Sequence, residues 1–303
     1  MPEEALAGRV RALAREKGAL ILAHNYQMPE VQDAADFVGD SLELARKAAE
    51  ARATLILFCG VRFMAETAAI LNPDALVLEP DQRAGCPMAD MLPVDGLRKL
   101  KEKHPDALVV SYVNSSAKVK AESDYCCTSG NAARVVGALP AEREIIFVPD
   151  VSLGEYVRAK TGRDLILWQG YCPTHHRITA EAVREARERH PKAKVVVHPE
   201  CTPDVTALAD EVASTSGIMR YVGETPYEEY VIGTENGMLH RLEREFPGKK
   251  VYQVTSLAIC PNMKLNTLEK MLWSLEDMKY RVTVPVDTAG RARIALERML
   301  TLV

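Results

Sequence analysis

The stretches that decide the fold are ALILAH at residues 19–24, ALVVSY at residues 107–112 and AKVVVH at residues 193–198. Each is a short apolar run that predicts a buried strand, and the last residues of the three runs lie 88 and 86 positions apart. A charged amphipathic stretch precedes each run, so we expect a helix before every strand. A period of this length indicates a small domain that is repeated along the chain.

The same period continues beyond these strands. Two further apolar runs follow in each copy and predict a second and a third strand, at residues 54–58 and 75–78, 144–148 and 165–168, and 229–232 and 251–254. Helices that alternate with buried strands favour a parallel sheet with right-handed crossovers. We therefore expect an α/β protein of three homologous three-layer α/β/α domains with small parallel sheets, in a pseudo-three-fold arrangement around a central active site.

The repeat also sets the expected domain boundaries. Residues 1–88, 89–174 and 175–279 each contain one copy. The C-terminal segment 280–303 begins with a strand-like run and ends in a helical stretch, and we expect it to return to the first domain. A chain of 303 residues is long enough to bury a core in each of three small domains.

Composition narrows the class of function. The formal net charge of −4 gives no reason to expect nucleic acid as a partner. No apolar run approaches the roughly 20 residues that span a bilayer, and charges interrupt residues 1–18, where a secretory signal would need an apolar core. The expectation is a cytoplasmic protein without a membrane partner.

Three of the seven cysteines recur with the repeat. Cys86, Cys172 and Cys260 each follow the third strand of a copy and each precede a proline, and an odd number of cysteines argues against a fully paired disulfide framework. Since the carboxyl ends of parallel strands gather at one edge, these thiols are expected to meet at the centre. Proline suits the first position of a helix, so a helix N-terminus is expected to face each thiolate.

Two kinds of metal centre fit three such thiols. A [4Fe-4S] cluster with three cysteine ligands would leave one iron open, and an open iron is a Lewis acid suited to removing a hydroxyl as water. The alternative is a structural zinc ion completed by His175. The remaining cysteines are expected to be packing residues, namely Cys59, Cys126, Cys127 and Cys201.

Acid, base and hydrogen-bonding groups stand at the end of the first strand of every copy. The three sets are His24-Asn25-Tyr26, Tyr112-Val113-Asn114 and His198-Pro199-Glu200. One such histidine alone is more often structural than catalytic, but three sets at equivalent positions favour a catalytic role. Glu200 is the one carboxylate among them and is our candidate for proton abstraction.

A hydroxyl residue lies 17 positions after each of these strand ends. Ser41, Ser129 and Thr215 are expected to cap helices, which is typically worth about 1 kcal/mol. A helix N-terminus also binds phosphate or carboxylate through its free N–H groups. Three such sites indicate a substrate with several acidic groups.

Taken together, these segments resemble the quinolinate synthase family. The resemblance covers nearly the whole chain and rests on AHNYQ (residues 23–27), GDS (39–41), YVNS (112–115), CTSGNA (127–132), HPEC (198–201) and STSG (214–217), together with the three Cys-Pro segments. It implies a [4Fe-4S] cluster on Cys86, Cys172 and Cys260. It further implies a condensing transferase that makes quinolinate from iminoaspartate and dihydroxyacetone phosphate, releasing phosphate and two waters, in de novo NAD biosynthesis.

The same resemblance implies roles for individual residues. The catalytic set would be Glu200, Tyr26, Tyr112 and His198. The substrate-binding set would be His24, Ser41, Asn114, Ser129, Ser214 and Thr215. A transient contact with L-aspartate oxidase, which supplies iminoaspartate, is implied as well.

Two other classes of function remain open on the residues alone. An aconitase-like [4Fe-4S] hydro-lyase would share the open iron without any condensation chemistry. A cluster-binding sensor or electron carrier would normally hold all four irons through protein ligands, and no fourth cysteine stands at an equivalent position.

Overall fold

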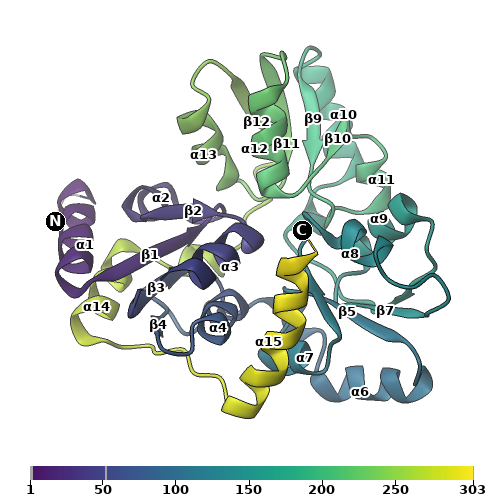
Figure 1. Cartoon of the computed structure of the whole chain (residues 1–303). Helices are drawn as coiled ribbons and strands as arrows, with labels where there is room; N and C mark the ends of the chain where they lie inside the picture. Colours follow the sequence, from purple (N-terminus) through teal and green to yellow (C-terminus); the bar gives the residue numbers. More distant parts are fainter. Residues whose placement is uncertain (1–2, 52, 303) are drawn as a thin grey trace.

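Three parallel sheets of identical strand order form the protein. The computed structural model describes residues 3–51 and 53–302, and its sheets have the orders β2-β1-β3-β4, β6-β5-β7-β8 and β10-β9-β11-β12. Helices flank the sheets, and the three α/β units surround a common centre (Figure 1). The predicted fold class is therefore confirmed.

The elements follow the repeat in chain order. The first unit contains α1 (Glu3–Lys17), β1 (Ala19–His24), α2 (Pro29–Ala34), β2 (Phe37–Gly39), α3 (Ser41–Glu50), β3 (Leu55–Cys59), α4 (Arg62–Leu71), β4 (Leu76–Leu78) and α5 (Pro87–Asp90). The second contains α6 (Val94–Lys103), β5 (Leu108–Tyr112), α7 (Ala117–Ala121), β6 (Tyr125–Cys127), α8 (Ala132–Gly137), β7 (Ile145–Val148), α9 (Val151–Thr161), β8 (Ile166–Leu167) and the 3-10 helix η1 (His175–Arg177). The third contains α10 (Ala180–Arg189), β9 (Lys194–Val197), α11 (Pro203–Thr206), β10 (Glu211–Val212), α12 (Thr215–Glu224), β11 (Glu229–Gly233), α13 (Met238–Glu245), β12 (Lys250–Gln253) and η2 (Met263–Leu265). Helices α14 (Leu268–Asp277) and α15 (Val286–Thr301) end the chain.

Each sheet has one edge strand more than the sequence predicted. These strands, β2, β6 and β10, are two or three residues long, which is too short for a periodic pattern. An aspartate carboxylate precedes each and accepts the N–H of a residue in the neighbouring central strand: Asp36 from Ile21 at 2.7 Å, Asp124 from Val109 at 2.8 Å and Asp210 from Val195 at 2.8 Å. The aspartates of the repeat thus fix the register of the edge strands.

The central strands bury both of their faces. Leu22, Val110 and Val196 occupy equivalent positions and join one hydrophobic cluster that runs through all three units. Their neighbours at the preceding position, Ile21, Val109 and Val195, each pack into a separate cluster under the outer helices. Side chains on one face of each central strand therefore pack the three units against one another. Side chains on the other face pack each sheet against its own outer helices.

The C-terminal segment spans more than one unit. Helix α14 packs on α1, and Arg281 forms an isolated antiparallel bridge with Leu78. Helix α15 packs against α7 and β6 of the second unit and against α4 of the first, and Figure 1 shows it in yellow between them. The predicted domain limits, with residues 280–303 assigned to the first domain, stay a prediction.

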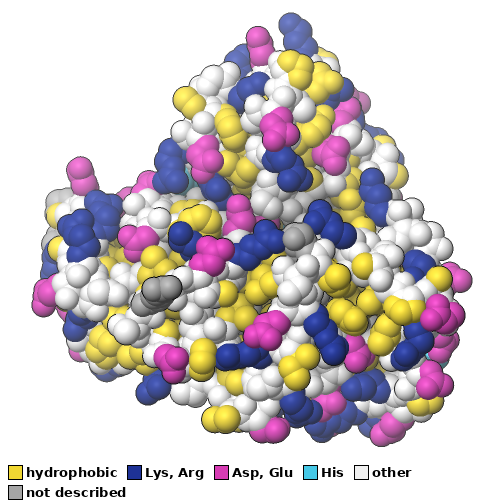
Figure 2. Space-filling model, in the orientation of Figure 1, with side chains coloured by type: hydrophobic (Ala, Val, Ile, Leu, Met, Phe, Trp, Pro, Cys, Tyr) yellow, Lys and Arg dark blue, Asp and Glu magenta, His cyan; other side chains and the backbone are white. Residues whose placement is uncertain are grey.

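The surface is mixed in charge on the face that Figure 2 shows, where basic and acidic side chains are interspersed. Within the described part of the chain, no helix is both long enough and apolar enough to cross a membrane.

Candidate active site

A cavity at the centre of the three units collects the predicted residues. Its empty volume is about 650 Å³, with the solvent at its mouth included. Twelve of the predicted residues line it: His24, Tyr26, Ser41, Cys86, Tyr112, Asn114, Ser129, Cys172, His198, Glu200, Thr215 and Cys260. The thirteenth predicted residue, Ser214, does not line the cavity. It directly precedes Thr215 and caps α12 by accepting the N–H of Gly217 at 3.3 Å.

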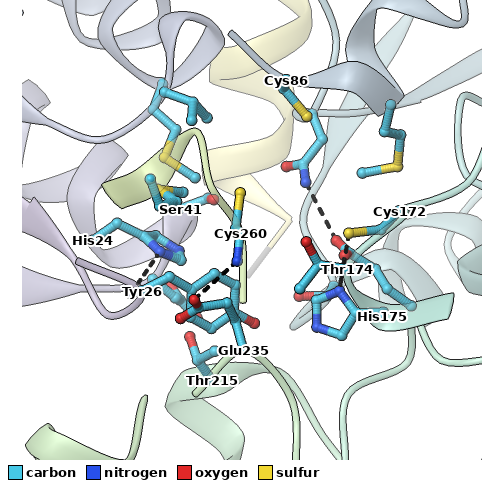
Figure 3. A pocket seen from close by; sticks show the side chains of 18 of the residues that line it. His24, Tyr26, Ser41, Cys86, Cys172, Thr174, His175, Thr215, Glu235 and Cys260 are labelled. Atoms are coloured by element: carbon cyan, nitrogen blue, oxygen red, sulfur yellow. Dashed lines mark hydrogen bonds and ion pairs between the residues drawn. The ribbon is translucent and has the colours of Figure 1, made fainter. Parts of the chain in front are cut away.

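The parallel sheets bring these residues together. The three central strands β1, β5 and β9 end at the cavity, so the residues that follow them point into it from three sides. Figure 3 shows His24 and Ser41 of the first unit across the cavity from Cys172 and His175.

Glu200 lies at the centre of a buried hydrogen-bond network. The Tyr112 hydroxyl donates to its Oε1 at 2.5 Å, and the Asn114 amide donates to the same oxygen at 3.3 Å. His175 Nδ1 lies 2.7 Å from Oε2. Burial raises the pKa of Glu200, but the charge and hydrogen bond of His175 outweigh it and hold that pKa below the usual range. The carboxylate is therefore ionised.

Both tyrosines of the cavity stay protonated. Burial, and then the charge of Glu200, raise the pKa of Tyr112 and of Tyr26 well above the usual value. The Tyr26 hydroxyl lies 2.6 Å from Thr234 Oγ1, which in turn lies 2.9 Å from His175 Nε2. Hydrogen bonds thus connect Tyr26 with His175 and, through it, with Glu200.

The two predicted histidines have the same tautomer. His24 Nδ1 accepts the N–H of Tyr26 at 3.1 Å, and His198 Nδ1 accepts the N–H of Glu200 at 3.3 Å. Burial lowers the pKa of each ring to about 3, so both are neutral and carry their proton on Nε2. His198 Nε2 lies 3.1 Å from Ser129 Oγ and donates to it, which leaves the proton of that hydroxyl for a ligand.

The prediction that Ser41, Ser129 and Thr215 cap helices is wrong. Asp40 caps α3 and Ser214 caps α12, so Ser41 and Thr215 are the first helical residues. Ser129 lies in the turn before α8, whose N-cap residue is Asn131. Neighbouring side chains cap α3 and α12, no side chain among the described residues caps α8, and the predicted hydroxyls line the cavity instead.

The three Cys-Pro cysteines enter the cavity from three units. Cys86, Cys172 and Cys260 are free, half-buried thiols, and their sulfur atoms face a common space in Figure 3. Burial raises the pKa of Cys86 to about 12 and also raises the pKa of the other two, while backbone N–H groups two or three residues further along oppose this. Only Pro87 opens an α-helix; Pro173 and Pro261 lead into 3-10 turns, so the prediction of a helix behind every thiol holds for one.

The three thiols do not by themselves form a compact site for a single ion. A zinc ion with Zn–S bonds of about 2.3 Å would hold its sulfurs about 3.8 Å apart. Among the described residues, one group of possible ligand atoms lies within 4.8 Å of one another, and it consists of Cys172, His175 and Glu200. Cys86 and Cys260 lie outside that group, so the three sulfur atoms do not all lie within 4.8 Å of one another.

Sequence reasoning missed several residues of the site. His175 was considered only as a zinc ligand, and Thr234, Glu235 and Lys264 were not considered. Glu235 is fully buried, lines the cavity, accepts the N–H of Cys260 at 3.1 Å and pairs with Lys264 at 2.9 Å. Thr234 and Glu235 directly follow β11, so the end of the second strand in each repeat was the signal that could have found them.

Comparison with known proteins finds similar sequences over nearly the whole chain. A family model described as "Quinolinate synthetase A protein" matches residues 8–301. The chain is 53% identical over 302 residues to a quinolinate synthase of Methanosarcina barkeri, covering 100% of this chain and 99% of that one. It is 52% identical over 303 residues to one of Dehalococcoides mccartyi, with full coverage of both chains, and 52% identical over 295 residues to one of Thermodesulfovibrio yellowstonii, covering 97% of each.

Proposed function

The chain belongs to the quinolinate synthetase A family, and from this premise we propose that it condenses iminoaspartate with dihydroxyacetone phosphate to form quinolinate for NAD biosynthesis. Phosphate and two waters would be released. The observation that carries the proposal is the convergence of Glu200, two tyrosines, two neutral histidines and three thiols on one cavity.

The anionic substrate groups would be bound by neutral donors. His24 is an uncharged ring that offers an N–H on Nε2, while His198, also uncharged, donates its N–H to Ser129. The hydroxyls of Ser41, Ser129 and Thr215 line the same cavity. Carboxylates and a phosphate accept such hydrogen bonds, while a neutral wall avoids the cost of burying uncompensated cations. Ser214 would support this wall through its cap on α12.

Asn114 is suited to the nitrogen of iminoaspartate. Its amide donates to Glu200, so Oδ1 faces away as an acceptor, and this buried oxygen has no partner among the described residues. An N–H of the substrate would satisfy it. Such an unpaired acceptor in a substrate cavity otherwise costs about 1–3 kcal/mol.

Glu200 and the tyrosines would move the protons. Glu200 would take a proton from the condensing carbon, since its carboxylate is ionised and buried. Tyr112, which is hydrogen-bonded to Glu200, would return a proton to a leaving hydroxyl. Tyr26, which belongs to the first unit, would donate a proton in the same way. His198 would orient Ser129 and the bound anion.

Cys86, Cys172 and Cys260 would hold a [4Fe-4S] cluster. When bound, the cluster would supply a Lewis-acidic iron without a protein ligand, which favours departure of a hydroxyl. The supply of iminoaspartate by transient contact with L-aspartate oxidase and the cytoplasmic location belong to the same proposal.

The test is turnover by anaerobically purified protein. Iminoaspartate and dihydroxyacetone phosphate should yield quinolinate and one phosphate, measured by chromatography and a phosphate assay. Reversible dehydration of a small hydroxy-acid without condensation would instead support an aconitase-like hydro-lyase and overturn the proposal.

A further inference from the structure

Arg241 and Asn25 lie behind the cavity wall and contact one of its hydroxyls. Arg241 Nη1 donates to Asn25 Oδ1 at 2.7 Å, and Asn25 Nδ2 donates to Thr215 Oγ1 at 2.8 Å. Asn25 is fully buried and Thr215 is 2% exposed. Of the three, only Thr215 lines the cavity.

Arg241, Asn25 and Thr215 form a row of three hydrogen-bonded side chains. The chemistry of arginine fixes the direction of both hydrogen bonds in this row. A guanidinium has donors and no acceptor, so the amide atom that faces it must be the oxygen of Asn25. The NH₂ group then faces Thr215, whose oxygen must accept. In the reverse orientation, two N–H donors would face each other at 2.7 Å.

Thr215 is therefore left with a proton to donate. Among the residues that the structure describes, Thr215 Oγ1 has one hydrogen-bond partner, the Asn25 amide. Its proton is therefore available to a ligand in the cavity that Thr215 lines. Because Thr215 is also the first residue of α12, its own N–H lies at the same helix end.

Other contacts hold the row in place. Arg241 Nε donates to Glu245 on the same helix at 2.7 Å, which orients the guanidinium. The backbone of Asn25 donates to Gly39 at 3.1 Å and accepts from the Gln32 side chain at 3.2 Å. Neither Arg241 nor Asn25 needs a ligand to adopt this arrangement.

We propose that Arg241 and Asn25 are positioning residues that make Thr215 an obligatory hydrogen-bond donor, and so select an anionic oxygen, carboxylate or phosphate, at this point of the cavity. The inference rests on the proposed function for the identity of that ligand. Neither residue contacts the substrate itself.

Arg241→Met removes the group that orients the amide. Asn25 can then rotate, present its oxygen to Thr215 and take the proton that the ligand would have received. The anaerobic enzyme should bind anions roughly tenfold more weakly, the effect of losing one charge-assisted hydrogen bond. Isothermal titration with quinolinate and with inorganic phosphate, and the KM for dihydroxyacetone phosphate, distinguish the carboxylate from the phosphate, while kcat should change less than KM.

The same helix provides a matched control. Arg244, three residues further along, forms an ion pair with Asp33 at 2.7 Å and does not contact Asn25. Arg244→Met makes an identical change in charge and should leave anion binding unaltered. Arg241→Lys keeps a group that only donates and should restore much of the affinity.

Asn25→Asp tests the row without removing the arginine. The aspartate would pair with Arg241, keep the shape of the side chain and oblige Thr215 to donate to it, so anion affinity should again fall. Unchanged affinity in both Arg241→Met and Asn25→Asp, or an equal loss in Arg244→Met, would overturn the inference while leaving the function intact. Absence of quinolinate formation by the wild-type enzyme would instead overturn the proposed function.

Discussion

The Tyr112 hydroxyl donates a 2.5 Å hydrogen bond to Glu200 Oε1, although the two residues are 88 positions apart and belong to different units. Tyr112 is the last residue of the central strand β5, and Glu200 lies just beyond the central strand β9. This hydrogen-bonded pair therefore exists only because two copies of the repeat present their strand ends to one cavity.

Replacing Tyr112 by phenylalanine removes this donor. We expect kcat for quinolinate formation to fall by about 10²-fold or more, since a proton donor to the leaving group is lost. Iron content and melting temperature should change little. Tyr221→Phe, which lies outside the cavity, serves as the control. Normal turnover in Tyr112→Phe would exclude the hydroxyl from proton transfer.

Glu200→Gln should nearly abolish turnover, by about 10²- to 10⁴-fold, because the amide cannot accept a proton. Quinolinate should still bind, as measured by calorimetry. Glu188→Gln makes the same change of charge at an exposed position of α10. A Glu200→Gln enzyme with near-normal kcat would rule out the carboxylate as the base.

Ser129→Ala should raise the KM for dihydroxyacetone phosphate by roughly tenfold while iron content stays constant. The reason is that the Ser129 proton, left free by the His198 contact, would no longer bind the substrate. Steady-state kinetics under anaerobic conditions measure the effect, with exposed Ser256→Ala for comparison. Identical KM values would remove Ser129 from the anion site.

The anaerobic protein should contain about four irons per chain. Single changes of Cys86, Cys172 or Cys260 to serine should lower that content and abolish activity, whereas Cys59→Ala, in a buried strand, should not. Iron and sulfide analysis with Mössbauer spectroscopy measures the outcome. One zinc ion per chain in place of iron, or three serine variants with full iron, would contradict the cluster.

The burial of Lys120 should make the free energy of unfolding depend on pH. It is fully buried, its ammonium donates to the carbonyls of Ser115 and Phe63, and burial lowers its pKa from 10.5 to about 8, partly offset by Glu66. Between these two pH values the unfolded chain binds the proton and the folded chain does not, so this residue makes stability rise with pH. From below pH 8 to above pH 10.5, the titration of Lys120 alone should raise the free energy of unfolding by on the order of 3 kcal/mol.

Denaturant unfolding of wild type and Lys120→Met at pH 7 and pH 10 measures this. The wild type should gain stability relative to the variant as the pH rises, whatever the absolute difference at pH 7. A constant difference between the two proteins would mean that Lys120 titrates normally.

The sequence by itself determined the internal repeat and the positions of the nine strands that it predicts. The run at residues 19–24 forms β1 with the predicted limits, and the other eight predicted strands lie within two residues of their observed ends. This succeeded because a buried strand depends on a local apolar run, and the repeat supplied three versions of each run. The equivalent positions of the Cys-Pro pairs and of the strand-end residues then pointed to one centre.

The tertiary structure alone decided how these residues are connected. Which residue caps α3 or α12 depended on competition between neighbours, such as Asp40 against Ser41, that a local pattern does not resolve. The contacts of Glu200 with Tyr112 and of Asn25 with Arg241 join residues 88 and 216 positions apart. Such contacts depend on how the three units pack against one another, and that packing is set by the shape and polarity of whole surfaces rather than by the periodicity of any one segment.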